Sequence, residues 1–342
     1  MNYSELHEAA NGQLGPYCKN CVVCNGRACG CAMPGPGSKY PGTAASRNFD
    51  AWQKIDLNMD TFHPNQELDI RLELFGHRFS APIFAAPIGA VDLHYSGKYN
   101  DYTYNAILTK AAADYGIMAF TGEGIDPGVM KSAADNIAAL GGIGCPTIKP
   151  WGRESVFEKL DYLNERNILC AAMDIDAAGL PLLRAANTDA GGKSVPEMRE
   201  IVQYAKMPFI IKGIMTPSGA EKAVEAGAAA IVVSNHGGRV FGCGAATAEV
   251  LPEIADAVKG QIKILVDGGI RTGADVFRAL ALGADAVLIG RPVLNAVYGS
   301  AEEGLRIYMD KLVSELTDTM FMTGVSRLSE ISRANIHKEY RF

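Results

Sequence analysis

The stretch IKILVDGGIRTGADVFRALALGADAVLIGRP (residues 262–292) decides the fold prediction. It contains two short apolar runs, 262–269 and 285–290, that are typical of buried strands. Between them, ADVFRALALGA has the amphipathic spacing of a helix. Strands that are apolar on both faces belong to parallel sheets, whose connections are usually helices. The stretch therefore predicts one strand–helix–strand unit.

The same alternation of apolar runs and helical patterns extends over the chain from about residue 80. Six further strand candidates precede the two above, at 82–87, 117–122, 140–146, 168–176, 208–213 and 229–235. Eight strands that each precede a helix are typical of an α/β fold, the (β/α)8 TIM barrel, which takes about 250 residues plus insertions. An open, doubly wound sheet is the alternative, but the first junction, APIGAVDLHYSG, lacks the G-x-G-x-x-G turn of that fold.

The chain of 342 residues is longer than such a barrel alone. We expect residues 1–79 to form an N-terminal extension, with a Cys-rich segment at 18–31. Residues 80–342 are expected to form the barrel, which one or two helices within 301–342 would close. A second independent domain is not expected.

The composition is that of a soluble globular protein, with 48% hydrophobic and 20% charged residues. The net charge of −6 disfavours nucleic acid or an anionic membrane as a partner. The N-terminus lacks the apolar core of a signal peptide, and no apolar run approaches the ~20 residues of a transmembrane helix. We therefore expect a cytoplasmic protein.

In a barrel, the residues that follow the C-terminal ends of the strands line the active site. VDGGIRTG and LIGRP follow the last two strands, and each places glycine and arginine beside a helix N-terminus. Free N–H groups and the helix dipole favour an anion there, so we expect a phosphate site. Its candidate residues are Asp267, Gly268, Gly269, Arg271, Gly290 and Arg291. The alternative is that the glycines only permit tight turns and the arginines are solvated.

Charged residues at other strand ends indicate catalysis. Lys212 ends the apolar run FIIK, where an ammonium group suits a Schiff base or an anionic cofactor, unless it is a solvated loop residue. His236 and Arg239 lie three residues apart in SNHGGRV (234–240), so a general base and a carboxylate-binding guanidinium can face one cavity. Asp176 can orient the imidazole and stabilise its protonated form.

Three segments, IIKG (210–213), AAAIVVSNHGGR (228–239) and ILVDGGIRTGADVFRALALGADAVLIGRP (264–292), together resemble the FMN-dependent α-hydroxy acid oxidase and dehydrogenase family. Glycolate oxidase and lactate oxidase belong to this family. The resemblance runs from about residue 80 to 336, where TGVSRLSEISRANI is similar to the family's C-terminus. It implies FMN as the cofactor, oxidation of an L-2-hydroxy acid such as lactate to a 2-oxo acid, and a homotetramer.

The resemblance also implies a role for each matching residue. His236 would accept the hydroxyl proton of the substrate while the α-hydrogen passes as hydride to FMN N5; a carbanion route is the rival. Asp176 would orient His236, Arg239 would bind the substrate carboxylate, and Lys212 would stabilise the reduced flavin. Further contacts with the flavin or its phosphate are implied for Pro87, Ile88, Gly89, Thr121, Ser234, Asp267, Gly268, Gly269, Arg271, Gly290 and Arg291.

The chain departs from the family on the substrate side. The family has a tyrosine after the third strand, where this chain reads CPTIKPW, with Lys149 near that place. A second tyrosine, in the N-terminal region, is replaced by cysteines and glycines. DID replaces the family's Thr-Val-Asp, so Asp174 adds a negative charge at a flavin-facing position, and we count both Asp174 and Lys149 as flavin contacts. Arg184 is the nearest counterpart of a second substrate arginine.

The Cys-rich segment, CKNCVVCNGRACGC, spaces its cysteines as C-x2-C-x2-C-x4-C-x-C. The five candidate metal ligands are Cys18, Cys21, Cys24, Cys29 and Cys31. Closely spaced thiolates in a cytosolic chain are typical of iron–sulfur or zinc ligation, and redox-active or unligated thiols are the alternative. An iron–sulfur centre beside FMN would carry electrons to a protein acceptor, whereas zinc would only fold the segment.

The leading prediction is an FMN-dependent 2-hydroxy acid dehydrogenase that passes electrons to an acceptor other than oxygen. A barrel enzyme similar to isoprenyl diphosphate isomerase would need a diphosphate and a divalent-metal site in place of His236 and Arg239. A flavin-dependent electron-transfer or redox-sensing protein would instead work through the cysteines, without turnover of hydroxy acids.

Overall fold

The computed structural model of the chain describes residues 1–30, 34–186 and 188–337. Its main sheet has the parallel strands β3 (Ile83–Ala85), β4 (Phe120–Thr121), β5 (Cys145–Ile148), β6 (Ala171–Asp174), β7 (Phe209–Ile214), β8 (Ala230–Val233), β9 (Lys263–Val266) and β10 (Ala286–Ile289). They pair in the order β3-β10-β9-β8-β7-β6-β5-β4. A parallel bridge between Ala85 and Ala119, directly before β4, joins the two ends of this order. The predicted (β/α)8 TIM barrel is therefore confirmed.

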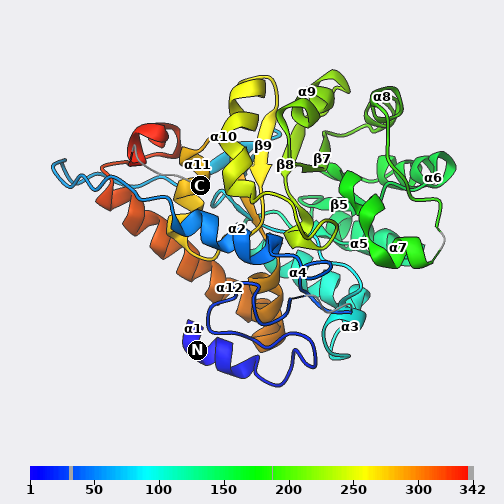
Figure 1. Cartoon of the computed structure of the whole chain (residues 1–342), viewed down its shortest axis with the longest axis horizontal. Helices are drawn as coiled ribbons and strands as arrows, with labels where there is room; N and C mark the ends of the chain where they lie inside the picture. Colours follow the sequence, from blue (N-terminus) through cyan, green and yellow to red (C-terminus); the bar gives the residue numbers. More distant parts are fainter. Residues whose placement is uncertain (31–33, 187, 338–342) are drawn as a thin grey trace.

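A long helix follows each barrel strand and lies on the outside of the sheet (Figure 1). These helices are α4 (Asp101–Tyr115), α5 (Pro127–Ala139), α6 (Arg153–Asn164), α8 (Val195–Tyr204), α9 (Pro217–Glu225), α10 (Thr247–Val258), α11 (Gly273–Ala281) and α12 (Arg291–Met322). Local sequence sets where they begin: Thr272 caps α11 by accepting a hydrogen bond from the N–H of Asp275. Helix α12 breaks at Ser300 and Ala301, so its second half forms a separate helical segment.

Most barrel strands are shorter than the apolar runs that predict them, and one predicted strand is displaced. The apolar run 140–146 is not a strand throughout, because β5 begins only at Cys145. Gly141 and Gly142 have φ of +92° and +82°, and this left-handed pair turns the chain after α5. The strand is therefore displaced toward the C-terminus, and Lys149 follows it directly.

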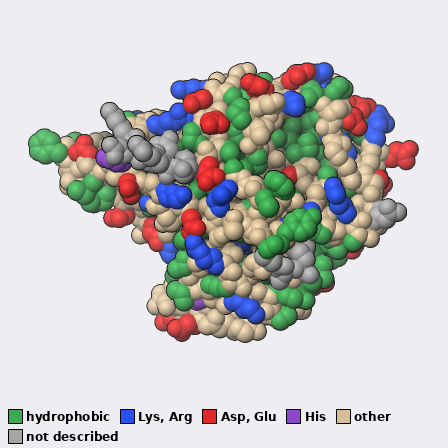
Figure 2. Space-filling view, viewed as in Figure 1, with side chains coloured by type: hydrophobic (Ala, Val, Ile, Leu, Met, Phe, Trp, Pro, Cys, Tyr) green, Lys and Arg blue, Asp and Glu red, His purple; other side chains and the backbone are tan. Residues whose placement is uncertain are grey.

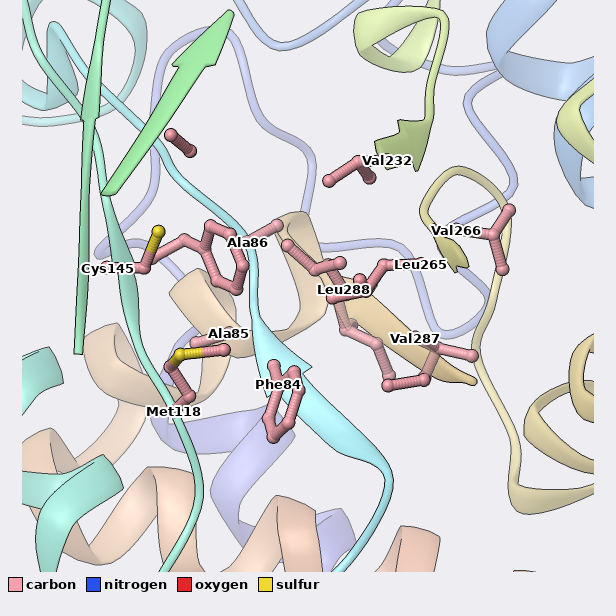
Figure 3. Packing of buried hydrophobic residues seen from close by; sticks show 14 of the residues in the cluster. Phe84, Ala85, Ala86, Met118, Cys145, Val232, Leu265, Val266, Val287 and Leu288 are labelled. Atoms are coloured by element: carbon pink, nitrogen blue, oxygen red, sulfur yellow. The ribbon is translucent and has the colours of Figure 1, made fainter. Parts of the chain in front are cut away.

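Buried apolar side chains form one continuous cluster that includes all eight barrel strands. Figure 3 shows Phe84, Cys145, Val232, Leu265 and Leu288 gathered within it, from strands that lie far apart in the sequence. Such a cluster holds the strand ends in fixed positions, because protein interiors are closely packed.

The N-terminal extension contains α1 (Tyr3–Ala9), α2 (Ala44–Gln53) and the antiparallel pair β1 (Leu72–Leu74) and β2 (His77–Phe79). Helix α1 lies beside α12, and its Leu6 belongs to the core cluster (Figure 1). Helix α2 reaches the barrel mouth, where the buried Trp52 donates a hydrogen bond from Nε1 to the carbonyl of Gly268, 2.8 Å away. The extension therefore contributes to both the core and the site, and its boundary at residue 79 stays a prediction.

Basic and acidic side chains are interspersed on the face of the molecule shown in Figure 2. Among the helices of the described residues, none is both long and apolar enough to cross a membrane.

Candidate active site

A cavity opens at the carboxyl ends of the barrel strands. The predicted site residues that line it are Pro87, Ile88, Gly89, Lys149, Lys212, His236, Arg239, Asp267, Gly268, Gly269, Arg271, Gly290 and Arg291. Thr121, Asp174 and Ser234 are buried at the strand ends, and Asp176 is half-buried. The structure therefore brings the predicted residues together at one end of the barrel.

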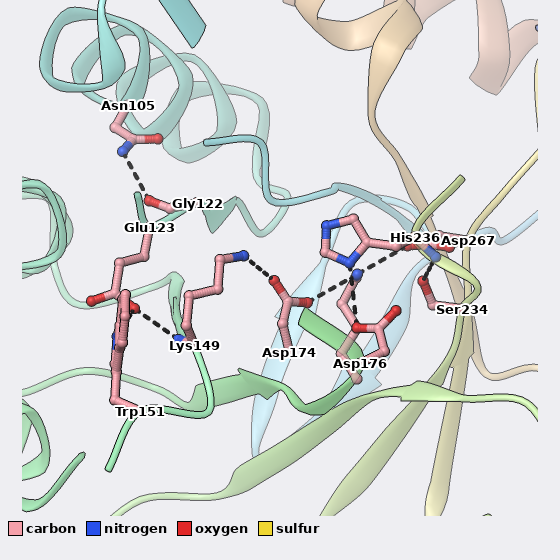
Figure 4. A network of polar contacts seen from close by, with 11 residues as sticks. Asn105, Gly122, Glu123, Lys149, Trp151, Asp174, Asp176, Ser234, His236 and Asp267 are labelled. Carbon is pink, nitrogen blue, oxygen red and sulfur yellow. Dashed lines mark hydrogen bonds and ion pairs between the residues drawn. The ribbon is translucent and has the colours of Figure 1, made fainter. Parts of the chain in front are cut away.

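His236 begins the short 3-10 helix η2 (His236–Gly238), directly after β8. Its Nδ1 lies 3.3 Å from Oδ1 of Asp176, which belongs to η1 (Ile175–Gly179) after β6 (Figure 4). Its backbone N–H donates to the hydroxyl of Ser234 at 3.1 Å, and its φ of +56° is uncommon for a residue with a side chain. Because Asp176 faces Nδ1, Nε2 is the nitrogen available for proton exchange.

A buried row of opposite charges lies beside this pair (Figure 4). Asp174 accepts from Nζ of Lys149 at 2.7 Å and lies 3.0 Å from Nζ of Lys212, which is 3.7 Å from Asp267. Burial opposes ionisation of Asp174, but the two ammonium groups hold its pKa well below the usual range. Burial raises the pKa of Asp267, against the effect of Lys212. The row places two ammonium groups at the base of the cavity.

The far end of the cavity is built for an anion. Gly268 and Gly269 have φ of +90° and +84°, and a Cβ at Gly269 would lie 2.2 Å from the backbone oxygen of Asn48 in α2. Arg291 begins α12, whose first N–H groups have no acceptors within the helix. Its guanidinium nitrogen NH1 is buried and has no hydrogen-bond partner among the described residues. A bound anionic group would satisfy both features.

Arg239 is held by residues that sequence reasoning did not identify. One guanidinium nitrogen donates to the carbonyl of Gly35 in the N-terminal extension, and the other lies 2.8 Å from Nε2 of His94, which ends α3 (Val91–His94). Burial, together with the charge of Arg239, lowers the pKa of His94 to about 3. A neutral His94 therefore positions the guanidinium without repelling it.

Glu123 was also missed, although it lies two residues after the end of β4 and lines the cavity. Its carboxylate accepts from the backbone N–H of Lys149 at 2.7 Å and from Nε1 of Trp151 at 2.8 Å. Lys159, buried on α6, is 2.6 Å from its other oxygen. Listing every charged residue beyond a strand end would have found Glu123, because its position follows the same rule as that of Lys149.

The expected second arginine does not reach the cavity. Arg184 in α7 (Pro181–Ala185) is exposed, and its Nε donates to the carbonyl of Ala178 at 3.2 Å. The cavity wall here consists of Leu180, Leu182 and Leu183. This side of the site is therefore apolar.

In the Cys-rich segment, Sγ of Cys24 lies 3.8 Å from NH2 of Arg271, and Cys31 lies outside the described residues. Burial raises the pKa of the Cys18 thiol to about 11, and the charges of Cys24, Cys29 and Cys21 add to this increase. Cys21 and Cys24 line one cavity with Arg271 and Asn295, and Sγ of Cys18 is 4.0 Å from Oδ1 of Asn295. No three of these thiols lie within 4.8 Å of one another, since the one such group of ligand atoms found among the described residues is Asp174, Asp176 and His236.

The sequence model of FMN-dependent dehydrogenases matches residues 37–136 and 176–338. The chain belongs to the FMN-dependent dehydrogenase family. The two long stretches outside the match, 1–36 and 137–175, contain the Cys-rich segment and Lys149 respectively. Divergence from this family is therefore concentrated where the sequence departs from the expected tyrosines.

Curated relatives in this family include a peroxisomal (S)-2-hydroxyacid oxidase of Arabidopsis thaliana, 42% identical over 46% of this chain and 42% of its own length. An L-lactate dehydrogenase of Pseudomonas aeruginosa is 47% identical over 42% of this chain and 38% of its own length. The chain thus matches about two fifths of the length of these relatives.

Among solved structures, mandelate oxidase with 2-hydroxy-phenylacetamide is 25% identical, with a TM-score of 0.79 over 98% of this chain and 97% of the oxidase. Flavocytochrome b2 with sulfite bound is 20% identical, with a TM-score of 0.76 over 87% of this chain and 79% of its own. The second likeness supports the fold alone.

The residues present fit FMN, the family's cofactor. The unpartnered nitrogen of Arg291 and the glycine turns suit its phosphate. The buried ammonium of Lys212 suits a ring that becomes anionic on reduction. The cavity that joins these two positions is continuous.

Proposed function

We propose that the protein oxidises an L-2-hydroxy acid to a 2-oxo acid with bound FMN. The observation that carries the proposal is the His236–Asp176 pair, 3.3 Å apart, at the mouth of a cavity that Arg239 and Lys212 also line. In one cavity, a base can accept the hydroxyl proton of the substrate, a guanidinium can bind its carboxylate, and an ammonium group can neutralise negative charge that develops on the flavin.

FMN, when bound, supplies the acceptor for the hydride from the α-carbon. His236 accepts the hydroxyl proton at Nε2, and Asp176 at Nδ1 stabilises the imidazolium that forms. Arg239 orients the substrate through its carboxylate, because a guanidinium binds a carboxylate with two parallel hydrogen bonds. Lys212 neutralises negative charge at the base of the cavity, where Asp174 and Asp267 keep it protonated: they raise its pKa, against the effect of burial.

FMN is proposed to contact Pro87, Ile88, Gly89, Thr121, Lys149, Asp174, Lys212 and Ser234 with its ring, and Asp267, Gly268, Gly269, Arg271, Gly290 and Arg291 with its phosphate end. The cavity position of most of these residues supports the assignment. The zinc or iron–sulfur centre at the cysteines, the homotetramer and the cytoplasmic location remain predictions.

We propose further that the substrate carries an apolar side chain. Leu180, Leu182 and Leu183 line the wall at the position where a second arginine was expected. Each buried CH2 of the substrate would contribute about 0.8 kcal/mol, so four-carbon branches should bind more tightly than glycolate.

Anaerobic titration of the purified holoenzyme tests the proposal. L-2-hydroxyisocaproate, L-lactate and the achiral glycolate are each added to the protein, and bleaching of the flavin band is recorded. D-2-hydroxyisocaproate and D-lactate are the controls. We expect bleaching with L-isomers, at lowest concentration for L-2-hydroxyisocaproate. No bleaching with any hydroxy acid would instead favour an electron-transfer or redox-sensing protein.

The acceptor is proposed to be a molecule other than oxygen, such as a redox protein. The support is the thiol segment beside Arg271, which lies outside the family match. Reoxidation of the substrate-reduced enzyme should be slow in air and fast with an artificial one-electron acceptor; fast reoxidation in air would refute this part.

A further inference from the structure

The Cys-rich segment has an unusual pattern of burial. Cys18, Cys21, Cys24 and Cys29 are half-buried, whereas Val22 and Val23 between them are 86% and 50% exposed. A short segment that folds on its apolar side chains would bury the valines. Here the cysteines are more buried than the two valines that lie between them.

Contacts that do not use sulfur hold the segment in place. Asn20, with φ of +42°, donates from Nδ2 to the carbonyl of His7 at 2.8 Å and accepts from Nδ2 of Asn295 at 3.1 Å. Nε of Arg271 donates to the carbonyl of Cys24 at 2.7 Å. The thiols themselves form no disulfide among the described residues. Cys24 is thus held against Arg271 at the phosphate end of the catalytic cavity. Cys21 and Cys24 line a second cavity with Arg271 and Asn295, and Cys18 lies beside Asn295.

The spacing of these thiols discriminates between metal sites. Cys18, Cys21 and Cys24 form a C-x2-C-x2-C run, the arrangement that supplies three ligands to one [4Fe–4S] cluster, and Cys29 follows after four residues. Tetrahedral zinc, with Zn–S of about 2.3 Å, would bring its sulfurs within about 4 Å of one another. No three of the described thiols lie within 4.8 Å. Sulfurs that bind different irons of one cluster are farther apart, so a [4Fe–4S] cluster does not require such a group.

Positive charge surrounds the same place. Arg271 extends NH2 to within 3.8 Å of Sγ of Cys24, and its Nε donates to the carbonyl of the same residue at 2.7 Å. Four thiolates around a cluster carry net negative charge, and N–H groups directed at cluster sulfurs adjust its reduction potential. Arg271 also lines the catalytic cavity.

We propose that Cys18, Cys21, Cys24 and Cys29 bind an iron–sulfur cluster of the [4Fe–4S] type beside the phosphate end of the FMN site. Arg271 contacts both sites and fixes their separation. The proposal rests on the cysteine segment alone and is independent of the substrate.

Metal analysis of the anaerobically purified holoenzyme tests the proposal, before and after incubation with ferrous iron, sulfide and a thiol reductant. We expect about four irons and four acid-labile sulfides per chain, and an EPR signal at low temperature after reduction with dithionite. Cys18→Ser and Cys24→Ser should each lose most of the iron while keeping the far-UV circular dichroism of the barrel. Cys243→Ser, which removes an exposed cysteine outside the segment, is the matched control and should keep it.

Cys21→Ser provides a second variant at the rim of the segment, in case Cys24→Ser does not fold. Stoichiometric zinc without sulfide would overturn the proposal. Retention of the iron by both Cys18→Ser and Cys21→Ser would also overturn it. A protein that contains no metal after reconstitution, and whose thiols all react with a thiol reagent, would overturn it as well.

Discussion

Replacement of Asp174 by asparagine removes the negative charge between two buried ammonium groups. Nζ of Lys149 is 2.7 Å and Nζ of Lys212 is 3.0 Å from the Asp174 carboxylate, and the side chains of the two lysines are 7% and 3% exposed. Removing one partner of a buried ion pair costs about 3–5 kcal/mol, because the charge left behind stays desolvated. With an unfolding entropy of about 2.1 cal/mol/K per residue, this lowers Tm by about 4–7 °C.

A double-mutant cycle separates this explanation from a general loss of packing. Lys149→Met leaves Asp174 paired with Lys212, so it should destabilise the protein less than Asp174→Asn does. Asp174→Asn leaves two ammonium groups unpaired, and the double variant lacks one of them. Its free energy of unfolding should therefore exceed that of Asp174→Asn by at least about 1 kcal/mol. Asp285→Asn is the control, since its partner Lys263 is 50% exposed and surface pairs contribute about 0–1 kcal/mol.

Thermal unfolding, followed by far-UV circular dichroism without added FMN and in FMN excess, provides the measurement. The reasoning is refuted if Asp174→Asn unfolds within 1–2 °C of the Asp285→Asn control, or if the effects of Lys149→Met and Asp174→Asn simply add.

Three other expectations follow from the site. His94 has a pKa of about 3 in the fold against about 6.5 in the unfolded chain, so it stays neutral while the unfolded chain gains a proton. Stability is therefore lost as the pH falls below about 6.5, by about 1.4 kcal/mol at pH 5.5. His94→Gln should abolish this part of the decrease in Tm between pH 7.5 and 5.5. Gly269→Ala should lose FMN and stability because its Cβ would meet Asn48, whereas Gly260→Ala, also at positive φ but in open space, should keep FMN; equal FMN content in the two would contradict the packing argument. Arg239→Lys should raise the substrate KM about 10–100-fold by loss of the two-bond geometry while FMN affinity, measured by fluorescence titration, stays within threefold.

The sequence predicts the barrel and its strand ends well, since both depend on local patterns. Apolar runs mark every barrel strand, and only the run at 140–146 is displaced, because Gly141 and Gly142 adopt positive φ that an apolar pattern does not reveal. Lys212, His236 and Arg239 are predicted for a similar reason: Lys212 lies near the C-terminal end of β7, and His236 and Arg239 belong to the loop that follows β8.

The contacts that the sequence could not predict join residues far apart in the chain. Arg239 meets Gly35, which is 204 residues away, and Asn48 and Asn235 exchange side-chain hydrogen bonds across 187 residues. The hydrophobic pattern of the sequence does not predict that the N-terminal extension packs over the barrel mouth. The cysteine spacing is visible in the sequence, but its position beside Arg271 depends on packing across 247 residues.

Single-turnover reduction of FMN in the absence of oxygen tests the central claim most directly. His236→Gln and the unaltered protein, both with FMN bound, are mixed with the L-2-hydroxy acid that bleaches the flavin best, and the rate of bleaching is measured. Loss of a general base should slow this step by about 10²–10⁴-fold at unchanged FMN content. Bleaching by the His236→Gln variant at the rate of the unaltered protein would show that His236 does not take the proton.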